Sequence, residues 1–81
     1  MNHLDHVTIE PGELACWMAY ANGLGAIGLT LRLELDLVAS DPSRHNLRRA
    51  ARAARYVASI ADAEQTAAIN AIATQLEETA R

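Results

Sequence analysis

The sequence predicts an all-α protein, a small bundle of three to four helices that pairs as a homodimer. Three observations predict it. Apolar residues recur at three- and four-residue spacing along most of the chain, which is the period of a helix face. Leu, Arg and seventeen Ala supply good helix formers, whereas Phe is absent and aromatic residues make up only 4% of the chain. A chain of 81 residues buries only about 60 to 65% of the surface of its unfolded form, which favours stabilisation by a partner.

An N-terminal arm is predicted over residues 1–10, followed by a first helix. The arm is mostly polar, with two apolar residues that alternate with polar ones, as in a short strand or a docked segment. Pro11 suits a first helical turn, because the N–H that it lacks would have no partner there. One helix face then follows: Leu14, Trp17, Met18 and Ala21. We expect a helix over residues 11–21 that ends in a left-handed cap at Asn22 and Gly23.

The segment from Leu24 to Ser40 fits two structures. Five leucines alternate with polar residues between positions 29 and 37, which is the period of a half-buried strand. Helix is favoured, because Leu, Arg and Glu are good helix formers and a lone strand would need a partner. The alternative is an α+β fold in which residues 29–37 form a strand that pairs across a dimer.

As a helix, residues 24–40 have two apolar faces. One face contains Leu24, Ile27, Leu31, Leu35 and Val38, and the other contains Leu29, Leu33 and Leu37. We therefore expect a central helix between two apolar surfaces. Gly25 and Gly28 would permit a close backbone approach at its start.

Asp41 and Pro42 predict the start of the next helix, with Asp as the N-cap and Pro as the first helical residue. Residues 43–81 contain neither Gly nor Pro, and one continuous helix of that length would run about 58 Å. A compact domain of this size is only about 30 Å across. We expect a break at residues 59–65, where Asp62 and Gln65 resemble a capping box. A narrow apolar stripe follows: Ile69, Ile72, Ala73, Leu76 and Ala80.

The charges are divided unequally along the chain. Five arginines and no acid occur within twelve residues, while the rest of the chain has ten acids and two arginines. The arginine stripe comprises Arg44, Arg48, Arg49, Arg52 and Arg55. It predicts a docking surface for carboxylates or phosphates, since the guanidinium group matches both. In the alternative interpretation, acids of the same monomer or dimer neutralise it: Glu34, Asp36, Asp41, Glu77 and Glu78.

Trp17 and Tyr20 are the other candidate partner-binding residues. Trp and Tyr often dominate the binding energy of interfaces, and the segment that contains them has few charges. The simpler interpretation is that Trp17 and Met18 pack in the core, with Tyr20 at its rim.

No pattern in the sequence predicts catalysis, a cofactor or a metal site. Cys16 is the single cysteine, so no disulfide can form within the chain, and no histidine lies on its helix to act as a base. The glycines lack the preceding strand and the Lys or Ser/Thr of a phosphate-binding loop. No run of about 18 apolar residues predicts a membrane span. We expect one cytoplasmic domain over residues 1–81, and the abundance of Ala and Arg with no Lys suggests a GC-rich bacterial or phage genome.

These observations favour a small non-catalytic interaction protein that blocks or adapts a macromolecular partner. An inhibitor of a host defence complex, encoded by a phage or mobile element, is the best hypothesis. The alternative is a nucleic-acid-binding regulator or antitoxin that places the arginine stripe on phosphates. The net charge of −3 makes a protein partner the favoured one, since nucleic-acid-binding domains usually carry excess positive charge.

Overall fold

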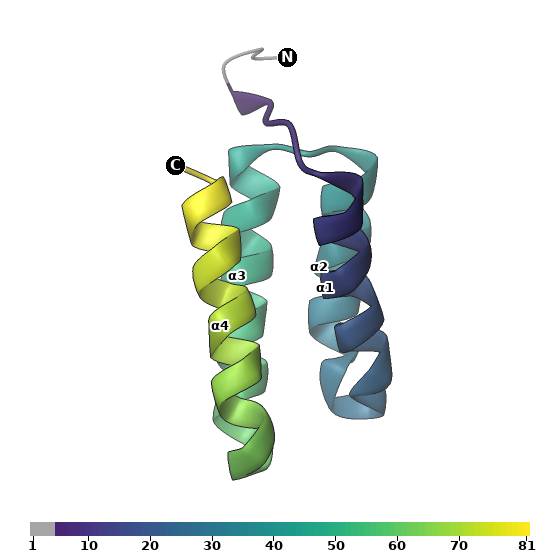
Figure 1. Ribbon diagram of the computed structural model, residues 1–81, viewed down its shortest axis with the longest axis vertical. Coiled ribbons are helices and arrows are strands. Elements are labelled where there is room, and N and C mark those ends of the chain that lie inside the picture. Colours follow the sequence, from purple (N-terminus) through teal and green to yellow (C-terminus); the bar gives the residue numbers. More distant parts are fainter. Residues whose placement is uncertain (1–4) are drawn as a thin grey trace.

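The computed structural model describes residues 5–81 and consists of two helical hairpins packed side by side (Figure 1). The elements are α1 (Pro11–Gly23), the 3-10 turn η2 (Gly25–Gly28), α2 (Leu29–Ser40), α3 (Arg44–Ile60) and α4 (Ala63–Thr79). Helix α1 packs on α2, α2 on α3 and α3 on α4. The predicted all-α bundle is confirmed, and the alternative strand over residues 29–37 is wrong because these residues lie in α2.

The N-terminal arm is docked on the bundle. The Val7 amide donates a hydrogen bond of 2.9 Å to the carbonyl oxygen of Pro42, and His6 and Ser43 form an isolated antiparallel bridge. Val7 and Ile9 are half-buried against the core. Of the two structures expected for residues 1–10, residues 5–10 adopt the docked arm, and residues 1–4 lie outside the described residues.

The turn between α1 and α2 differs from the prediction. Helix α1 continues to Gly23, and the residue with a left-handed backbone is Gly25, whose φ is 68°. The close backbone approach is found at Gly28, where an added Cβ atom would lie 2.5 Å from the carbonyl oxygen of Ala21. The chain therefore reverses through η2 instead of a single capping residue, and α2 begins at Leu29.

Helix α3 is capped by Ser43, and the prediction of Asp41 as its N-cap is wrong. The Ser43 hydroxyl accepts a hydrogen bond of 3.1 Å from the Asn46 amide. The Asp41 amide instead donates to the Leu37 carbonyl at the end of α2, at 2.8 Å. Residues 42 and 43 are held by the arm at His6 and Val7, which delays the helix by two residues.

The predicted break between the last two helices is confirmed. Helix α3 ends at Ile60 and α4 begins at Ala63, with Asp62 in the N-cap position. The capping box is not formed, since the Asp62 side chain makes no capping hydrogen bond. The Asp62 carbonyl oxygen accepts from the amides of Gln65 and Thr66, at 2.9 and 3.0 Å.

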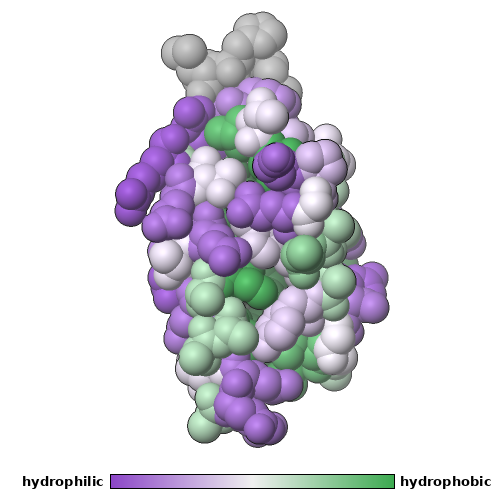
Figure 2. All heavy atoms as spheres, in the orientation of Figure 1, coloured by the Kyte–Doolittle hydropathy of each residue, from purple (hydrophilic) through white to green (hydrophobic). Residues whose placement is uncertain are grey.

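Alanines line much of the core between α3 and α4. Small side chains let two helices approach closely, and alanine also has the highest helix propensity. The largest fully buried side chains are Trp17, Leu31, Leu35, Leu47, Ile69, Leu76, Val38 and Val57. On the face that α1 and α4 present to the viewer, hydrophobic and hydrophilic side chains alternate in small patches (Figure 2).

The two apolar faces predicted for α2 have different surroundings. Leu31, Leu35 and Val38 are fully buried in the core. Leu29, Leu33 and Leu37 are 50%, 52% and 42% exposed. We expected both faces of α2 to be buried. Only the inner face is buried, because α1 and α3 cover that face alone.

Candidate protein-docking surface on α3

All five residues of the arginine stripe lie on α3. The Ser43 cap starts this helix, and its inner face is apolar, with Leu47, Ala50, Ala54 and Val57 buried. Helical periodicity then places the arginines on the sides and the outer face of α3. Arg49 and Arg55 form ion pairs with neighbouring helices, Arg48 and Arg52 are exposed without an ion pair in residues 5–81, and Arg44 is half-buried.

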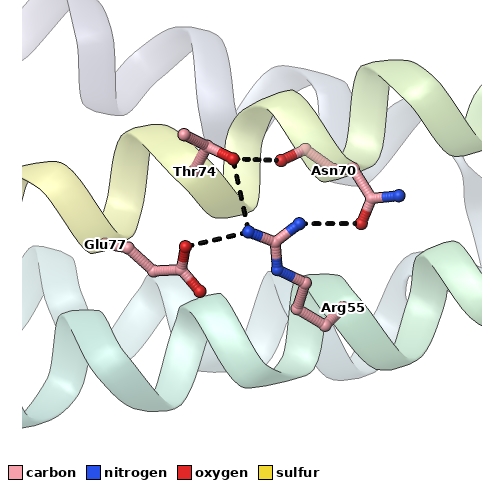
Figure 3. A network of polar contacts seen from close by, with 4 residues as sticks. All are labelled: Arg55, Asn70, Thr74 and Glu77. Carbon is pink, nitrogen blue, oxygen red and sulfur yellow. Dashed lines mark hydrogen bonds and ion pairs between the residues drawn. The ribbon is translucent and has the colours of Figure 1, made fainter.

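Arg55 is held by a polar network on α4 (Figure 3). Its guanidinium donates to the Glu77 carboxylate at 2.8 Å, to the Asn70 side-chain oxygen at 3.1 Å and to the Thr74 hydroxyl at 3.3 Å. The Thr74 hydroxyl in turn donates to the Asn70 carbonyl oxygen at 3.1 Å. Arg55 therefore connects α3 to α4.

Arg49 connects α3 to the opposite neighbour, α2. Its Nη2 atom lies 3.1 Å from Oε2 of Glu34. The other carboxylate oxygen of Glu34, Oε1, is buried and has no hydrogen-bond partner in residues 5–81. Two of the five arginines, Arg49 and Arg55, are therefore neutralised within the chain, by Glu34 and Glu77. Asp36, Asp41 and Glu78 form no ion pair within that range.

Arg48 and Arg52 form the part of the stripe that is not ion-paired. Arg48 is exposed, and its Nη2 atom lies 3.5 Å from the carbonyl oxygen of Ala80. Arg52 is exposed and makes no hydrogen bond or ion pair in the described part of the chain. Arg44 is half-buried in the first turn of α3. Arg48 and Arg52 are one turn apart, so their side chains leave the same side of the helix.

Trp17 and Tyr20 lie on α1, apart from the arginines. Trp17 is 2% exposed, and its Nε1 atom donates to the side-chain oxygen of Gln75 on α4, at 2.8 Å. Tyr20 is half-buried against the core. This is the arrangement of the simpler interpretation, with Trp17 in the core and Tyr20 at its rim. A buried indole offers no surface to a partner.

Sequence reasoning missed the polar residues that hold Arg55 and Trp17. The signal for the Arg55 network was present, since Asn70, Thr74 and Glu77 have the i, i+4, i+7 spacing of one helix face. A polar row of this kind, next to an arginine-rich helix, predicts pairing between the two helices. Gln75 gave no such signal, because its contact with Trp17 depends on how α1 lies beside α4.

Residues 5–81 contain neither a candidate metal site nor a helix that could span a membrane. No three or more His, Cys, Asp and Glu side chains are grouped so that they could hold a metal ion. No helix has both the length and the apolar character needed to cross a membrane.

No protein-family model, curated protein or solved structure matches this chain.

The contribution of the Arg55 network to stability can be measured with a double-mutant cycle. We expect Arg55→Met and Glu77→Gln to show a coupling of about 0.2–1 kcal/mol in the free energy of unfolding, because both side chains are close to half exposed. Urea unfolding followed by circular dichroism gives the four values. Arg52→Met removes the same charge at a residue that has no ion pair in residues 5–81, and we expect no change in the free energy of unfolding. A coupling near zero would show that the ion pair between Arg55 and Glu77 does not stabilise the bundle.

Proposed function

We propose that this protein is a non-catalytic interaction module that docks on an acidic surface of a partner protein through the solvent-facing arginines of α3. The observation that carries the proposal is the pair Arg48 and Arg52, exposed one turn apart and bound to no acid in residues 5–81. Guanidinium groups form strong hydrogen bonds with carboxylates and are enriched in protein interfaces. Within this class, we propose a phage or mobile-element inhibitor that blocks a host defence complex in the bacterial cytoplasm and acts as a homodimer.

The charge distribution favours a protein partner over nucleic acid. Glutamates already pair with Arg49 and Arg55, which reduces the positive charge of the stripe. The chain as a whole carries a net charge of −3, whereas domains that bind nucleic acid are usually basic. A protein with a local acidic surface would meet the positive side of α3 and avoid the acids of the other helices.

Reversing the charge of Arg52 tests the proposal. We expect the tagged protein to retain one stoichiometric partner from a bacterial host lysate, and Arg52→Glu to weaken that binding about tenfold or more. Arg52 is exposed and makes no hydrogen bond or ion pair in residues 5–81, so the variant should keep its helical circular dichroism.

A matched control changes the net charge by the same amount at a distance from α3. Ala15 and Ala19 are exposed on α1, and Ala15→Glu with Ala19→Glu also lowers the charge by two. We expect this variant to bind as the wild type does. Equal retention of the partner by Arg52→Glu, or no stoichiometric partner for the wild type, would contradict the proposal.

A nucleic-acid-binding regulator or antitoxin is the second candidate function. The observation that favours it is the absence of any acid in α3, together with the guanidinium of Arg52, which is not ion-paired in residues 5–81. It requires that duplex or single-stranded DNA bind at low salt, with an affinity that falls steeply as salt is raised. Arg48→Glu with Arg52→Glu should then abolish the binding. No binding at low salt would exclude this candidate.

A further inference from the structure

The outer face of α2 carries a row of exposed leucines. We call Leu29, Leu33 and Leu37 the outer leucine row. Their four-residue spacing aligns them in one ridge on the side of α2 opposite the core. All three side chains are about half exposed, although each is as large and apolar as the leucines buried on the inner face.

Other exposed apolar residues extend this surface onto α3. Tyr56 is 59% exposed and Ile60 is 51% exposed. They follow Arg49 by seven and eleven residues, close to two and three helical turns. Since Arg49 reaches Glu34 on α2, Tyr56 and Ile60 lie on the α2 side of α3. Monomeric soluble proteins seldom expose so many large apolar side chains on adjacent elements, and such a surface usually marks an interface.

We propose that the outer leucine row binds a second copy of this chain. The two copies pack antiparallel about a two-fold axis near Leu33. A two-fold interface joins the same surface of both copies, so the surface must complement itself. With the axis near Leu33, the two Leu33 side chains meet, and Leu29 of each copy lies opposite Leu37 of the other. Ridges of four-residue spacing pack against each other in the commonest class of helix contact.

The charges beside the row also complement themselves. Arg32 and Asp36 are exposed on one flank of α2, one turn apart, and neither forms an ion pair within residues 5–81. An antiparallel two-fold brings this flank against its own copy. Arg32 would then lie within about 3 Å, along the helix direction, of Asp36 in the second copy, because two residues of a helix rise that far. The symmetry repeats this contact, which gives two pairs of opposite charge.

This complementarity is the reason to choose a second copy as the occupant. A helix from another protein would need its own apolar ridge and an opposite arrangement of charges, whereas this chain supplies both. The inference rests on the dimeric part of the proposed function and uses neither Arg48 nor Arg52. Equal retention of the partner by Arg52→Glu would contradict docking through α3 and leave the dimer proposal standing, and a monomeric protein could still bind a partner through α3.

Sedimentation equilibrium of the full chain tests the dimer. We expect the wild type to associate to twice the 8.7 kDa mass of the chain, and Leu33→Glu to weaken dimerisation about tenfold or more. Leu33 is half exposed, so the variant should fold, and circular dichroism verifies this. Ala39→Glu is the control, because it adds the same charge at an exposed site of α2 outside the row. We expect Ala39→Glu to dimerise as the wild type does.

A charge exchange tests the orientation. Arg32→Asp and Asp36→Arg each place like charges in contact across the proposed axis, and each variant alone should dimerise more weakly than the wild type. Mixing the two variants restores opposite charges at both sites, so a heterodimer should form. A wild type that stays monomeric up to about millimolar concentration would overturn the proposal. A dimer that Leu33→Glu does not weaken, or a mixture that forms no heterodimer, would also overturn it.

Discussion

Replacing Trp17 with alanine is expected to lower the free energy of unfolding by about 3–5 kcal/mol. The indole is 2% exposed and is the largest side chain in the core. It also links α1 to α4 through its hydrogen bond to Gln75. A domain of this size has a total stability of about 4–12 kcal/mol, so this one substitution should remove a large part of it. Most of the loss comes from the cavity and from the apolar area returned to water.

Urea unfolding followed by circular dichroism at 222 nm measures the effect of Trp17→Ala. All samples should have one protein concentration, because association raises apparent stability. Gln75→Ala is the informative control, since it removes the hydrogen-bond acceptor and keeps the indole. We expect it to cost about 1 kcal/mol, as for a typical hydrogen bond. If the urea midpoint of unfolding were the same for Trp17→Ala as for the wild type, the indole could not be in the core.

Helix periodicity predicted most of the fold because it depends on neighbours along the chain. The inner face of α2 contains three residues of the apolar face predicted for it, Leu31, Leu35 and Val38. Pro11 starts α1, and the break expected at residues 59–65 contains the end of α3 and the start of α4. In each case the determining residues lie within one or two turns of each other.

The features that sequence reasoning missed depend on contacts between distant segments. Ser43 replaces Asp41 as the cap of α3 because His6 and Val7 hold the preceding residues. Arg49 binds Glu34, which lies 15 positions away in the sequence and on another helix. The pattern of the arginine stripe therefore identified a charged helix but could not show which charges are already neutralised.

The difference in burial between the two faces of α2 also depends on contacts between distant segments. Both faces are equally apolar in the sequence, and a helix alone gives no reason to cover one before the other. Covering the inner face requires α1 and α3 together, and their placement follows from the turn at Gly28 and the link at residues 41–43. The turn at Gly28 is therefore a sensitive point of the fold.

Gly28→Ala is expected to destabilise the protein by about 1–3 kcal/mol, although the substitution adds only one carbon. The backbone angles of Gly28, φ −90° and ψ 0°, are accessible to alanine, so the cost is steric. The new Cβ atom would lie 2.5 Å from the Ala21 carbonyl oxygen and 2.8 Å from the Cβ atom of Leu24. Neither atom is the free end of a flexible side chain. The turn between α1 and α2 would have to open, which displaces α1 from the core.

Gly23→Ala is the matched control for this substitution. Gly23 is the last residue of α1, and an added Cβ atom would have no neighbour within 4 Å. We expect Gly23→Ala to be as stable as the wild type or slightly more stable, because alanine has the higher helix propensity. Thermal unfolding at a fixed protein concentration compares the two variants directly. Equal melting temperatures for Gly28→Ala and Gly23→Ala would show that the backbone at Gly28 has more room than the structure indicates. A lower melting temperature for Gly28→Ala alone would show that close packing at η2 holds α1 against α2.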